Sequence, residues 1–263
     1  MLRRLVHKTM DFFLSLPSQR QLAYLEGRLA LKQGKGWGAG TIAEEVSACC
    51  SLLAEQPHLL VDIGGNRGAY AQEFLKRFPG ACVHIFEPSS YNVNILNSLF
   101  SSTPRVNIVG SALSDKPGTL TLYADEPGSG ISSLSKRRLD HFGIEMNAEE
   151  AVSVFRFDEY WKSFSSTFPV IDYVKIDVEG HELSVLEGFG DFLRQVKLIQ
   201  FEFGGCNIDT RTFLQDFWYF FSGQNFSLYR ITPCGPIAVS AYKEADEYFS
   251  TTNYIALNDK YRK

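Results

Sequence analysis

The sequence predicts an α/β fold: one doubly wound domain whose parallel sheet is covered on both faces, preceded by a helical N-terminal extension. Two observations predict this fold. Short apolar runs bounded by glycine or proline alternate with amphipathic stretches, and this alternation is typical of parallel strands joined by helices. Residues 1–33 carry apolar side chains at helical spacing and no strand pattern, which predicts a helical start of the chain.

The composition is that of a soluble globular chain. It has 263 residues, 44% of them hydrophobic and 21% charged, which excludes a disordered or fibrous chain. No stretch approaches the roughly 18 consecutive apolar residues of a membrane-spanning helix. The net charge of -4 provides no general attraction to nucleic acid, so we expect no nucleic-acid partner.

The cysteines and the start of the chain predict a cytoplasmic location. The five cysteines include the neighbours Cys49 and Cys50 and form no C-x-x-C pair, so neither a disulfide framework nor a thiolate zinc site is predicted. An odd number of cysteines suits a reducing compartment. The basic N-terminus has its apolar stretch interrupted by Asp11, so a secretory signal is not predicted.

The elements can be placed in chain order. A glycine-rich loop at 34–40 follows the helical extension, and Thr41 with Glu44 forms a capping box that opens a helix to about Glu55. Helices are also expected over about 70–78, 93–100 and 213–221, and a long polar connection over 124–150. The predicted strands are 59–63, 82–86, 106–109, 119–123, 152–155, 171–176, 196–201, and a terminal pair at 226–231 and 254–257.

In an open parallel sheet ligands bind at the carboxyl ends of the strands, so the residues that end each strand are the candidate site. The first strand ends in Asp62, followed by a turn with Gly64, Gly65 and Gly68, and glycines there let a ligand approach the backbone closely. The G-x-G-x-x-G pattern of a dinucleotide site is absent in either register. Asp62 also suits a cationic ligand better than a pyrophosphate.

The second strand ends in Glu87, followed by Pro88, which fits the first turn of the next helix. An acidic side chain at this position can accept hydrogen bonds from both hydroxyls of a ribose, as in other nucleotide-binding α/β folds. Glu87 is therefore predicted to bind the sugar of a nucleoside.

The strand at 171–176 is followed by a dense group of ionisable side chains. Five of the nine residues from Val174 to Glu182 are ionisable, and such a density at a strand end is typical of a proton-transfer or metal site. The alternative is a solvated helix start whose acids complement the helix dipole. That alternative suits Glu182 better than Asp177 or His181.

Five segments occur in a fixed order along the chain: 62–68 (DIGGNRG), 86–88 (FEP), 112–115 (ALSD), 132–134 (SSL) and 175–182 (KIDVEGHE). Taken together, these segments resemble those of the FkbM-type methyltransferases, over roughly residues 58–205. The resemblance implies a class I methyltransferase (Rossmann-like) fold with a seven-stranded sheet whose last strand is antiparallel. It divides the chain into a helical extension, 1–57, and an S-adenosylmethionine-dependent methyltransferase domain, 58–263.

The resemblance further implies O-methylation of a hydroxyl on a sugar, glycan or polyketide-type metabolite, with S-adenosyl-L-methionine as cofactor. Gly65 departs from the family pattern, which usually has alanine there, and we expect no loss of binding. The implied roles are methionine binding for Asp62, Gly64, Asn66 and Gly68, ribose binding for Glu87, adenine contact for Ser111 and Ala112, and contact with the methyl group and acceptor for Asp177, Glu179 and His181.

An alcohol acceptor must lose its proton, so the reaction needs in-line alignment and a general base. His181 is the predicted base, with Asp177 or Glu179 orienting it. A divalent metal held by these three residues and Glu202 is the alternative, but no second signal supports it, so no metal is predicted.

The connection at 124–150 contains the basic run 136–138, and we expect it to close over the acceptor and meet an anionic group, unless the run is a solvated charge cluster. The expected partner is a small-molecule or glycan acceptor with a free hydroxyl. Contact of residues 1–20 with a membrane surface, packing of this segment on the sheet, and a homodimer all stay open. N-methylation of a small molecule or peptide, or a non-catalytic nucleotide-binding module, are the alternative functions.

Overall fold

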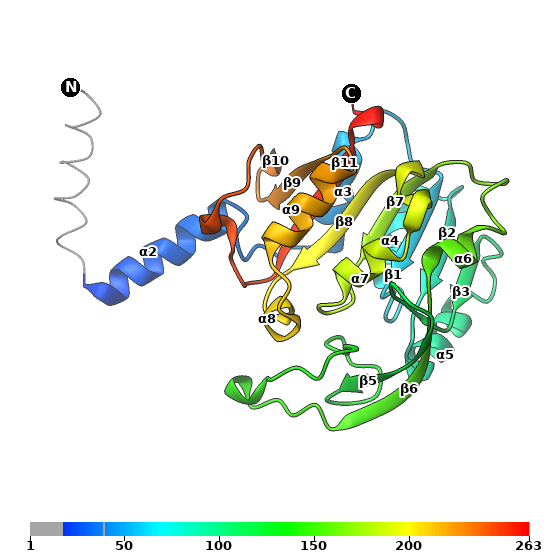
Figure 1. The fold of residues 1–263 in the computed structure, drawn as a ribbon, viewed down its shortest axis with the longest axis horizontal. Helices are drawn as coiled ribbons and strands as arrows, with labels where there is room; N and C mark the ends of the chain where they lie inside the picture. Colours follow the sequence, from blue (N-terminus) through cyan, green and yellow to red (C-terminus); the bar gives the residue numbers. More distant parts are fainter. Residues whose placement is uncertain (1–17, 39, 263) are drawn as a thin grey trace.

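The computed structural model describes residues 18–38 and 40–262 and has the predicted α/β fold, with helices on both faces of one large sheet (Figure 1). Every strand that the sequence predicts is present, with ends shifted by a few residues at most. The strands of the large sheet are β1 Leu59–Ile63, β2 Cys82–Phe86, β3 Val106–Val109, β7 Ile171–Ile176, β8 Val196–Phe203, β9 Phe226–Thr232, β10 Gly235–Ala238 and β11 Thr252–Asn258.

The large sheet has the order β3-β2-β1-β7-β8-β11-β9-β10. The strands β1, β2, β3, β7 and β8 run parallel to their neighbours within this group. The last strand, β11, is antiparallel to both β8 and β9, as predicted. Strand β10 pairs with the outer side of β9 and extends the predicted seven-stranded arrangement to eight.

Burial explains why the central strands read as continuous apolar runs. Every residue of β1 and β7 is buried, because helices cover the sheet on both faces. One face packs against α3 Ile42–Leu52, α4 Ala69–Arg77 and α5 Ser90–Leu99. The other face packs against α6 Phe157–Trp161, α7 Glu182–Glu187 and α9 Leu214–Gly223, while the short α8 spans Cys206–Thr210.

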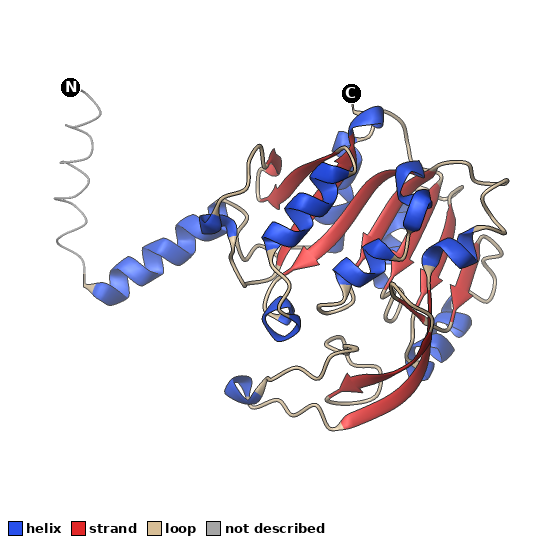
Figure 2. Cartoon of the chain, viewed as in Figure 1, coloured by secondary structure: helices blue, strands red, loops and turns tan. Residues whose placement is uncertain are grey.

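A second, three-stranded sheet was not predicted as a separate unit. It has the order β4-β6-β5, with β4 Ala112–Leu113, β5 Gly118–Ala124 and β6 Ala148–Phe155. Strands β5 and β6 pair antiparallel along their whole length, so the segment between them, residues 125–147, leaves and returns at one end. Figure 2 shows this small sheet lying opposite the carboxyl ends of the large sheet, and we call residues 125–147 the lid.

The N-terminal extension is helical where the structure describes it. Helix α2, Gln19–Lys32, begins at a capping box formed by Ser18 and Gln21, and it reaches away from the rest of the chain (Figure 1). The following turn is anchored on the sheet, since the Gly36 N–H donates to Thr252 Oγ1 at 2.9 Å. None of the helices within residues 18–38 and 40–262 is long and apolar enough to span a bilayer. The predicted membrane contact falls mostly on residues 1–17, which lie outside the described residues.

Candidate functional site

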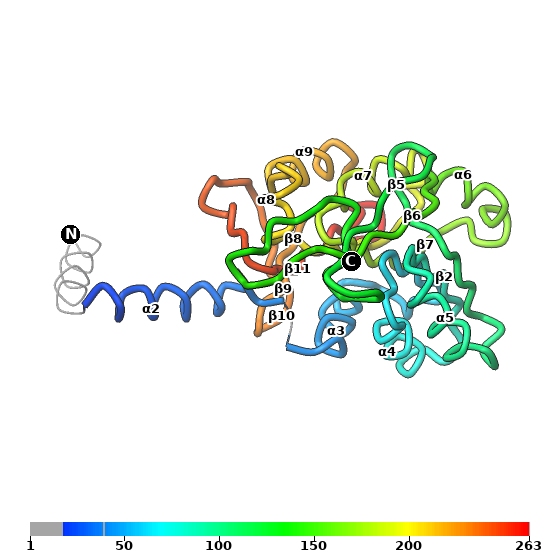
Figure 3. The backbone as a smooth tube through the Cα atoms, turned by 90° about the horizontal axis from the view of Figure 1, so that it is seen from below, coloured from blue at the N-terminus to red at the C-terminus, as the bar shows by residue number. Residues whose placement is uncertain are grey.

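A cavity of about 520 Å³ lies at the carboxyl edge of β1, β2, β7 and β8, and the lid contributes to its lining. Its volume is in the range of small-molecule and cofactor sites. Figure 3 shows the lid and its sheet passing over this edge when the molecule is seen from the carboxyl side. The predicted cofactor-binding residues that line it are Gly64, Asn66, Glu87, Ser111 and Ala112, and the predicted catalytic residues that line it are Asp177 and Glu179.

The turn after β1 depends on its glycines. Gly64 has φ +80°, and a Cβ there would lie 1.8 Å from the carbonyl oxygen of Asp177, so the ends of β1 and β7 approach closely only without a side chain. A Cβ on Gly65 would lie 2.2 Å from Ile85 Cγ2, so the alanine usual in the family would require Ile85 to move. Gly68, with φ +82°, is the N-cap of α4 and does not line the cavity.

Asp62 lies beneath this turn rather than in the cavity lining. Its side chain is fully buried, and neither carboxylate oxygen has a hydrogen-bond partner among the described residues. Burial raises the pKa of Asp62 to about 6, against the opposing effect of the nearby Lys175 ammonium. An unpaired carboxylate this deeply buried is costly, and it favours a cationic or hydrogen-bond-donating ligand next to the turn.

Glu87, at the end of β2, ties the turn to the second strand. Its Oε2 accepts a hydrogen bond from the Asn66 N–H at 2.8 Å, and its Oε1 accepts one from the Ser89 N–H at 2.9 Å. Asn66 has a positive φ of 46°, so this bond holds a strained residue in place. Asn92 Nδ2 also donates to Oε1, at 3.4 Å. A carboxylate has about four acceptor positions, so Glu87 keeps one of them, on Oε2, for a ligand hydroxyl.

Glu182 shapes the turn that follows β7. It is fully buried, and its Oε1 accepts hydrogen bonds from the N–H groups of Val178 at 3.2 Å and Gly180 at 3.0 Å. Burial raises the pKa of Glu182 to about 7. The chain reverses at Glu179 and Gly180, which both have positive φ, and the Glu179 side chain lines the cavity. Glu182 is therefore a turn-closing residue and not the solvated helix start considered from the sequence.

The structure does not bring His181 into the cavity lining. Its Nε2 lies 2.9 Å from Ser114 Oγ, which in turn donates to Asp115 Oδ1 at 3.0 Å. Burial lowers the pKa of His181. The reversal at Glu179 and Gly180 is the physical reason, because it directs residue 181 toward the end of β4 while residue 179 faces the cavity.

Lys175 is a buried cation among carboxylates. Its Nζ lies 2.9 Å from Asp177 Oδ2 and 5.0 Å from the centre of the Tyr70 ring. Burial lowers the pKa of Lys175, but the charges of Asp177 and Asp62 outweigh this effect, so the pKa lies above its usual value. Lys175 therefore stays protonated and partly neutralises the negative end of the cavity.

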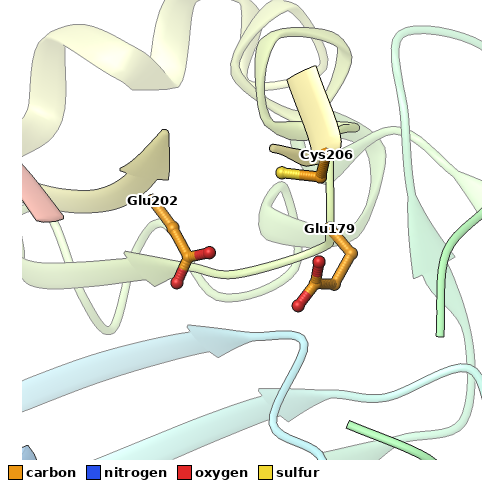
Figure 4. A group of neighbouring side chains, drawn as sticks. All are labelled: Glu179, Glu202 and Cys206. Atoms are coloured by element: carbon orange, nitrogen blue, oxygen red, sulfur yellow. The ribbon is translucent and has the colours of Figure 1, made fainter. Parts of the chain in front are cut away.

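Glu179, Glu202 and Cys206 form a compact cluster at this end (Figure 4). One potential ligand atom from each lies within 4.8 Å of the others, and Glu202 comes from the end of β8. This set differs from the metal set considered from the sequence, which contained Asp177 and His181. The Glu179 carboxylate is already paired with Arg137, and burial raises the pKa of the Cys206 thiol well above its usual value. A metal ion bound here would have to displace the Arg137 contact from Glu179 and release the thiol proton of Cys206.

We therefore expect chelation to leave the catalytic activity of the protein unchanged. Activity would be measured after dialysis against EDTA and again after addition of Mg²⁺ or Zn²⁺, with metal content determined by mass spectrometry. Loss of activity on chelation that either ion restores would contradict this expectation and make the cluster a metal site.

The lid is fastened over the cavity by its own basic run. The Arg137 guanidinium pairs with Glu179, and its Nε lies 3.7 Å from Asp209 Oδ2. Ser133 Oγ donates to the Glu179 carbonyl oxygen at 2.8 Å, while Lys136 pairs with Glu149 at 3.4 Å. The expected closure over the site agrees with this geometry, but these two cations contact carboxylates of the protein itself rather than standing free for an anionic acceptor.

The N-terminal extension also lines the cavity, which sequence reasoning missed. Helix α3 places Glu45 there, and its carboxylate accepts a hydrogen bond from Gln200 Nε2. Gln200 Oε1 in turn accepts hydrogen bonds from the hydroxyls of Tyr70 at 2.5 Å and Tyr173 at 2.6 Å. These residues lie on different elements, and no local sequence pattern connects them.

The strand order and the antiparallel last strand, with a ligand cavity at the carboxyl edge, define a class I methyltransferase fold. The chain belongs to the FkbM methyltransferase family, since the methyltransferase FkbM domain matches residues 62–228.

Two relatives are similar to this chain at low identity. The 2-O-methyltransferase NoeI of Sinorhizobium fredii is 25% identical over 162 residues, which cover 58% of this chain and 66% of NoeI, just under two thirds of its length. The methyltransferase sdnD of Sordaria araneosa is 25% identical over 197 residues, covering 64% of this chain and 76% of sdnD. Among solved structures, methyltransferase FkbM from Methylobacillus flagellatus matches with a TM-score of 0.45 and 15% identity, over 76% of this chain and 44% of that chain.

Proposed function

We propose that this chain is an S-adenosylmethionine-dependent O-methyltransferase that acts on a hydroxyl of a sugar, glycan or polyketide-type metabolite. The observation that carries the proposal is the single cavity in which the glycine turn, Glu87, Ala112 and Asp177 meet. The membership of the FkbM family and the name of one relative, a 2-O-methyltransferase, support the same reaction.

The residues of the cavity fit this cofactor. Glu87 has an acceptor position left on Oε2 for a ribose hydroxyl, and Ser111 and Ala112 also line the cavity, where a base would follow the sugar. Asp62 and Asp177 provide negative charge beside the turn, which favours the cationic methionine end. When bound, S-adenosylmethionine supplies an electrophilic methyl group on a positively charged sulfur.

The chain itself contributes alignment and the exclusion of water. The Arg137 contacts to Glu179 and Asp209 hold the lid down, and Ser133 ties it to the turn after β7. Holding two reactants at near-attack distance supplies several kcal/mol, and a closed lid limits competition from water.

The acceptor end of the cavity suits hydroxyl groups. Glu179 and Glu202 line it with carboxylate oxygens, which accept hydrogen bonds from hydroxyls, and the nearest lid cation is already paired. An anionic group such as a phosphate or uronate would meet like charge here. We therefore favour a neutral polyhydroxylated acceptor over the anionic one considered from the sequence.

The experiment that tests this proposal is isothermal titration of the purified protein with S-adenosylmethionine and, separately, with NAD. Saturable binding of S-adenosylmethionine alone is expected, after co-purified ligand has been excluded by mass spectrometry. Absence of binding, or preference for NAD, would overturn the proposal. Methyl transfer to an amine and not to a hydroxyl would retain the cofactor and replace O-methylation with N-methylation.

A further inference from the structure

Glu202 stands apart from the other carboxylates that line the cavity. Asp177 is paired with Lys175 and Glu179 with Arg137, while Glu87 accepts backbone N–H groups. The Glu45 carboxylate, also in the lining, bonds to Gln200. The Glu202 carboxylate has no hydrogen bond or ion pair within residues 18–38 and 40–262, although the residue is mostly buried. The Glu202 carboxylate is therefore unpaired, whereas the neighbouring carboxylates are each hydrogen-bonded or ion-paired.

Glu202 lies where a side chain could contact the acceptor. It lies at the carboxyl end of β8, next to β7 in the sheet, so it borders the part of the cavity next to Asp177. Figure 4 shows its carboxylate opposite that of Glu179, and both residues line the same cavity. A hydroxyl placed there would contact both.

We infer that Glu202 is the base that takes the proton of the acceptor hydroxyl, while Glu179, held by Arg137, orients that hydroxyl. The inference rests on the proposed function. It assigns the role of general base to Glu202 in place of His181, which lies outside the cavity lining and next to Ser114. Because the cluster is negative, it disfavours an anionic group on the acceptor next to the reacting hydroxyl.

The step balances as follows in atoms and electrons. The acceptor oxygen forms a bond to the methyl carbon as the sulfur–carbon bond breaks and leaves its electron pair on sulfur. The hydroxyl proton passes to a carboxylate oxygen of Glu202, which becomes a neutral carboxyl group. No oxidant, reductant or metal is needed.

The electrostatic surroundings make Glu202 a stronger base than an ordinary carboxylate. Burial and nearby negative charge raise the pKa of Glu202 well above its usual value, and only Lys175 opposes this effect from within the cluster. A base with a pKa closer to neutrality removes a hydroxyl proton more effectively. The charged or titratable groups that face it are Asp177, Glu179, Glu182 and Lys175, with Cys206 completing the cluster.

The first test is Glu202→Gln, which keeps the shape of the side chain and removes the proton-accepting oxygen. Acceptors would be neutral methyl glycosides together with their uronate and amino counterparts. We expect methylation of neutral glycosides, a fall in kcat of at least about 100-fold in the variant, and affinity for S-adenosylmethionine within about twofold of wild type by titration. The exposed Glu187→Gln is the matched control and should behave as wild type.

Two further readouts separate this inference from its rivals. The wild-type kcat should rise with pH as Glu202 ionises, and His181→Gln should keep this rise. A rise that is lost in His181→Gln and kept in Glu202→Gln would make His181 the base and overturn the inference. Methylation confined to uronates or amines would show that the acceptor is not a neutral sugar hydroxyl. Binding of S-adenosylmethionine without methylation of any glycoside would overturn the same assignment. Failure to bind S-adenosylmethionine would instead refute the proposed function.

A third readout needs no acceptor. A buried acid whose pKa is raised on folding destabilises the protein progressively as pH rises from its unfolded value through its folded value. Glu202→Gln should therefore raise the unfolding midpoint at pH 8 and not at pH 4, as measured by thermal melting. An unchanged or lowered midpoint at pH 8 would show that the carboxylate is compensated, contrary to the inference.

Discussion

Replacing Lys175 with methionine is expected to lower the free energy of unfolding by about 2–3 kcal/mol, because the buried ammonium that pairs with the partly exposed Asp177 and offsets the charge of the buried Asp62 is removed. The side chain of Lys175 is only 10% exposed and bonds Asp177 at 2.9 Å. Asp62 lies nearby with no hydrogen bond to either oxygen within the described chain. Urea unfolding monitored by circular dichroism would measure the loss.

The loss of unfolding free energy in Lys175→Met should be larger at high pH than at low pH. Burial raises the pKa of Asp62 to about 6, so its full negative charge develops only above that pH. The deprotonated carboxylate costs stability as pH rises through this value, and Lys175 offsets that cost in the wild type. The loss in Lys175→Met should therefore be larger at pH 8 than at pH 5.

Lys197→Met provides the matched control. Lys197 also forms a close pair, 2.7 Å from Asp172, but Asp172 additionally accepts hydrogen bonds from the N–H groups of His58 and Leu59. Its carboxylate stays partnered when the lysine is removed, so we expect a cost of about 1 kcal/mol. Equal costs for Lys197→Met and Lys175→Met would show that the acids around Lys175 are compensated by other groups.

Replacing Glu87 with alanine should weaken the binding of S-adenosylmethionine about 100-fold. A hydrogen bond to a charged group contributes about 1.5–3 kcal/mol, and the ribose would lose this acceptor. The variant also releases the Asn66 N–H, bonded to Glu87 at 2.8 Å, and so loosens the turn that lines the cavity. Isothermal titration at constant pH and salt would measure the change.

Two companion variants make the Glu87 result interpretable. Glu87→Gln keeps one acceptor oxygen and the volume of the side chain, so an intermediate affinity is expected. Glu187→Ala removes an exposed carboxylate outside the cavity lining and should bind as the wild type does. If Glu87→Ala kept wild-type affinity, Glu87 would have only the structural role of holding the turn, and the ribose assignment would be wrong.

Local patterns were sufficient for most of the fold. The apolar runs that became β1, β2 and β7 are buried over nearly their whole length, so hydrophobicity alone marks their position and bounds. The terminal pair also formed, as β9 and β11. The strands of the small sheet were predicted at 119–123 and 152–155, but their pairing into a separate sheet was not, because long-range pairing leaves no mark on local composition.

The candidate site was likewise predicted only in part. The sequence by itself determined the glycine turn, Glu87 and the acidic turn, because strand ends in a parallel sheet must meet at one edge. Only the tertiary structure decided which of these side chains face the cavity. Positive φ at Glu179 and Gly180 turns His181 away from the cavity, and packing of α3 and β8 brings in Glu45 and Glu202. The direction in which a side chain points depends on backbone reversals, and contacts between distant residues depend on packing. Short-range sequence patterns specify neither.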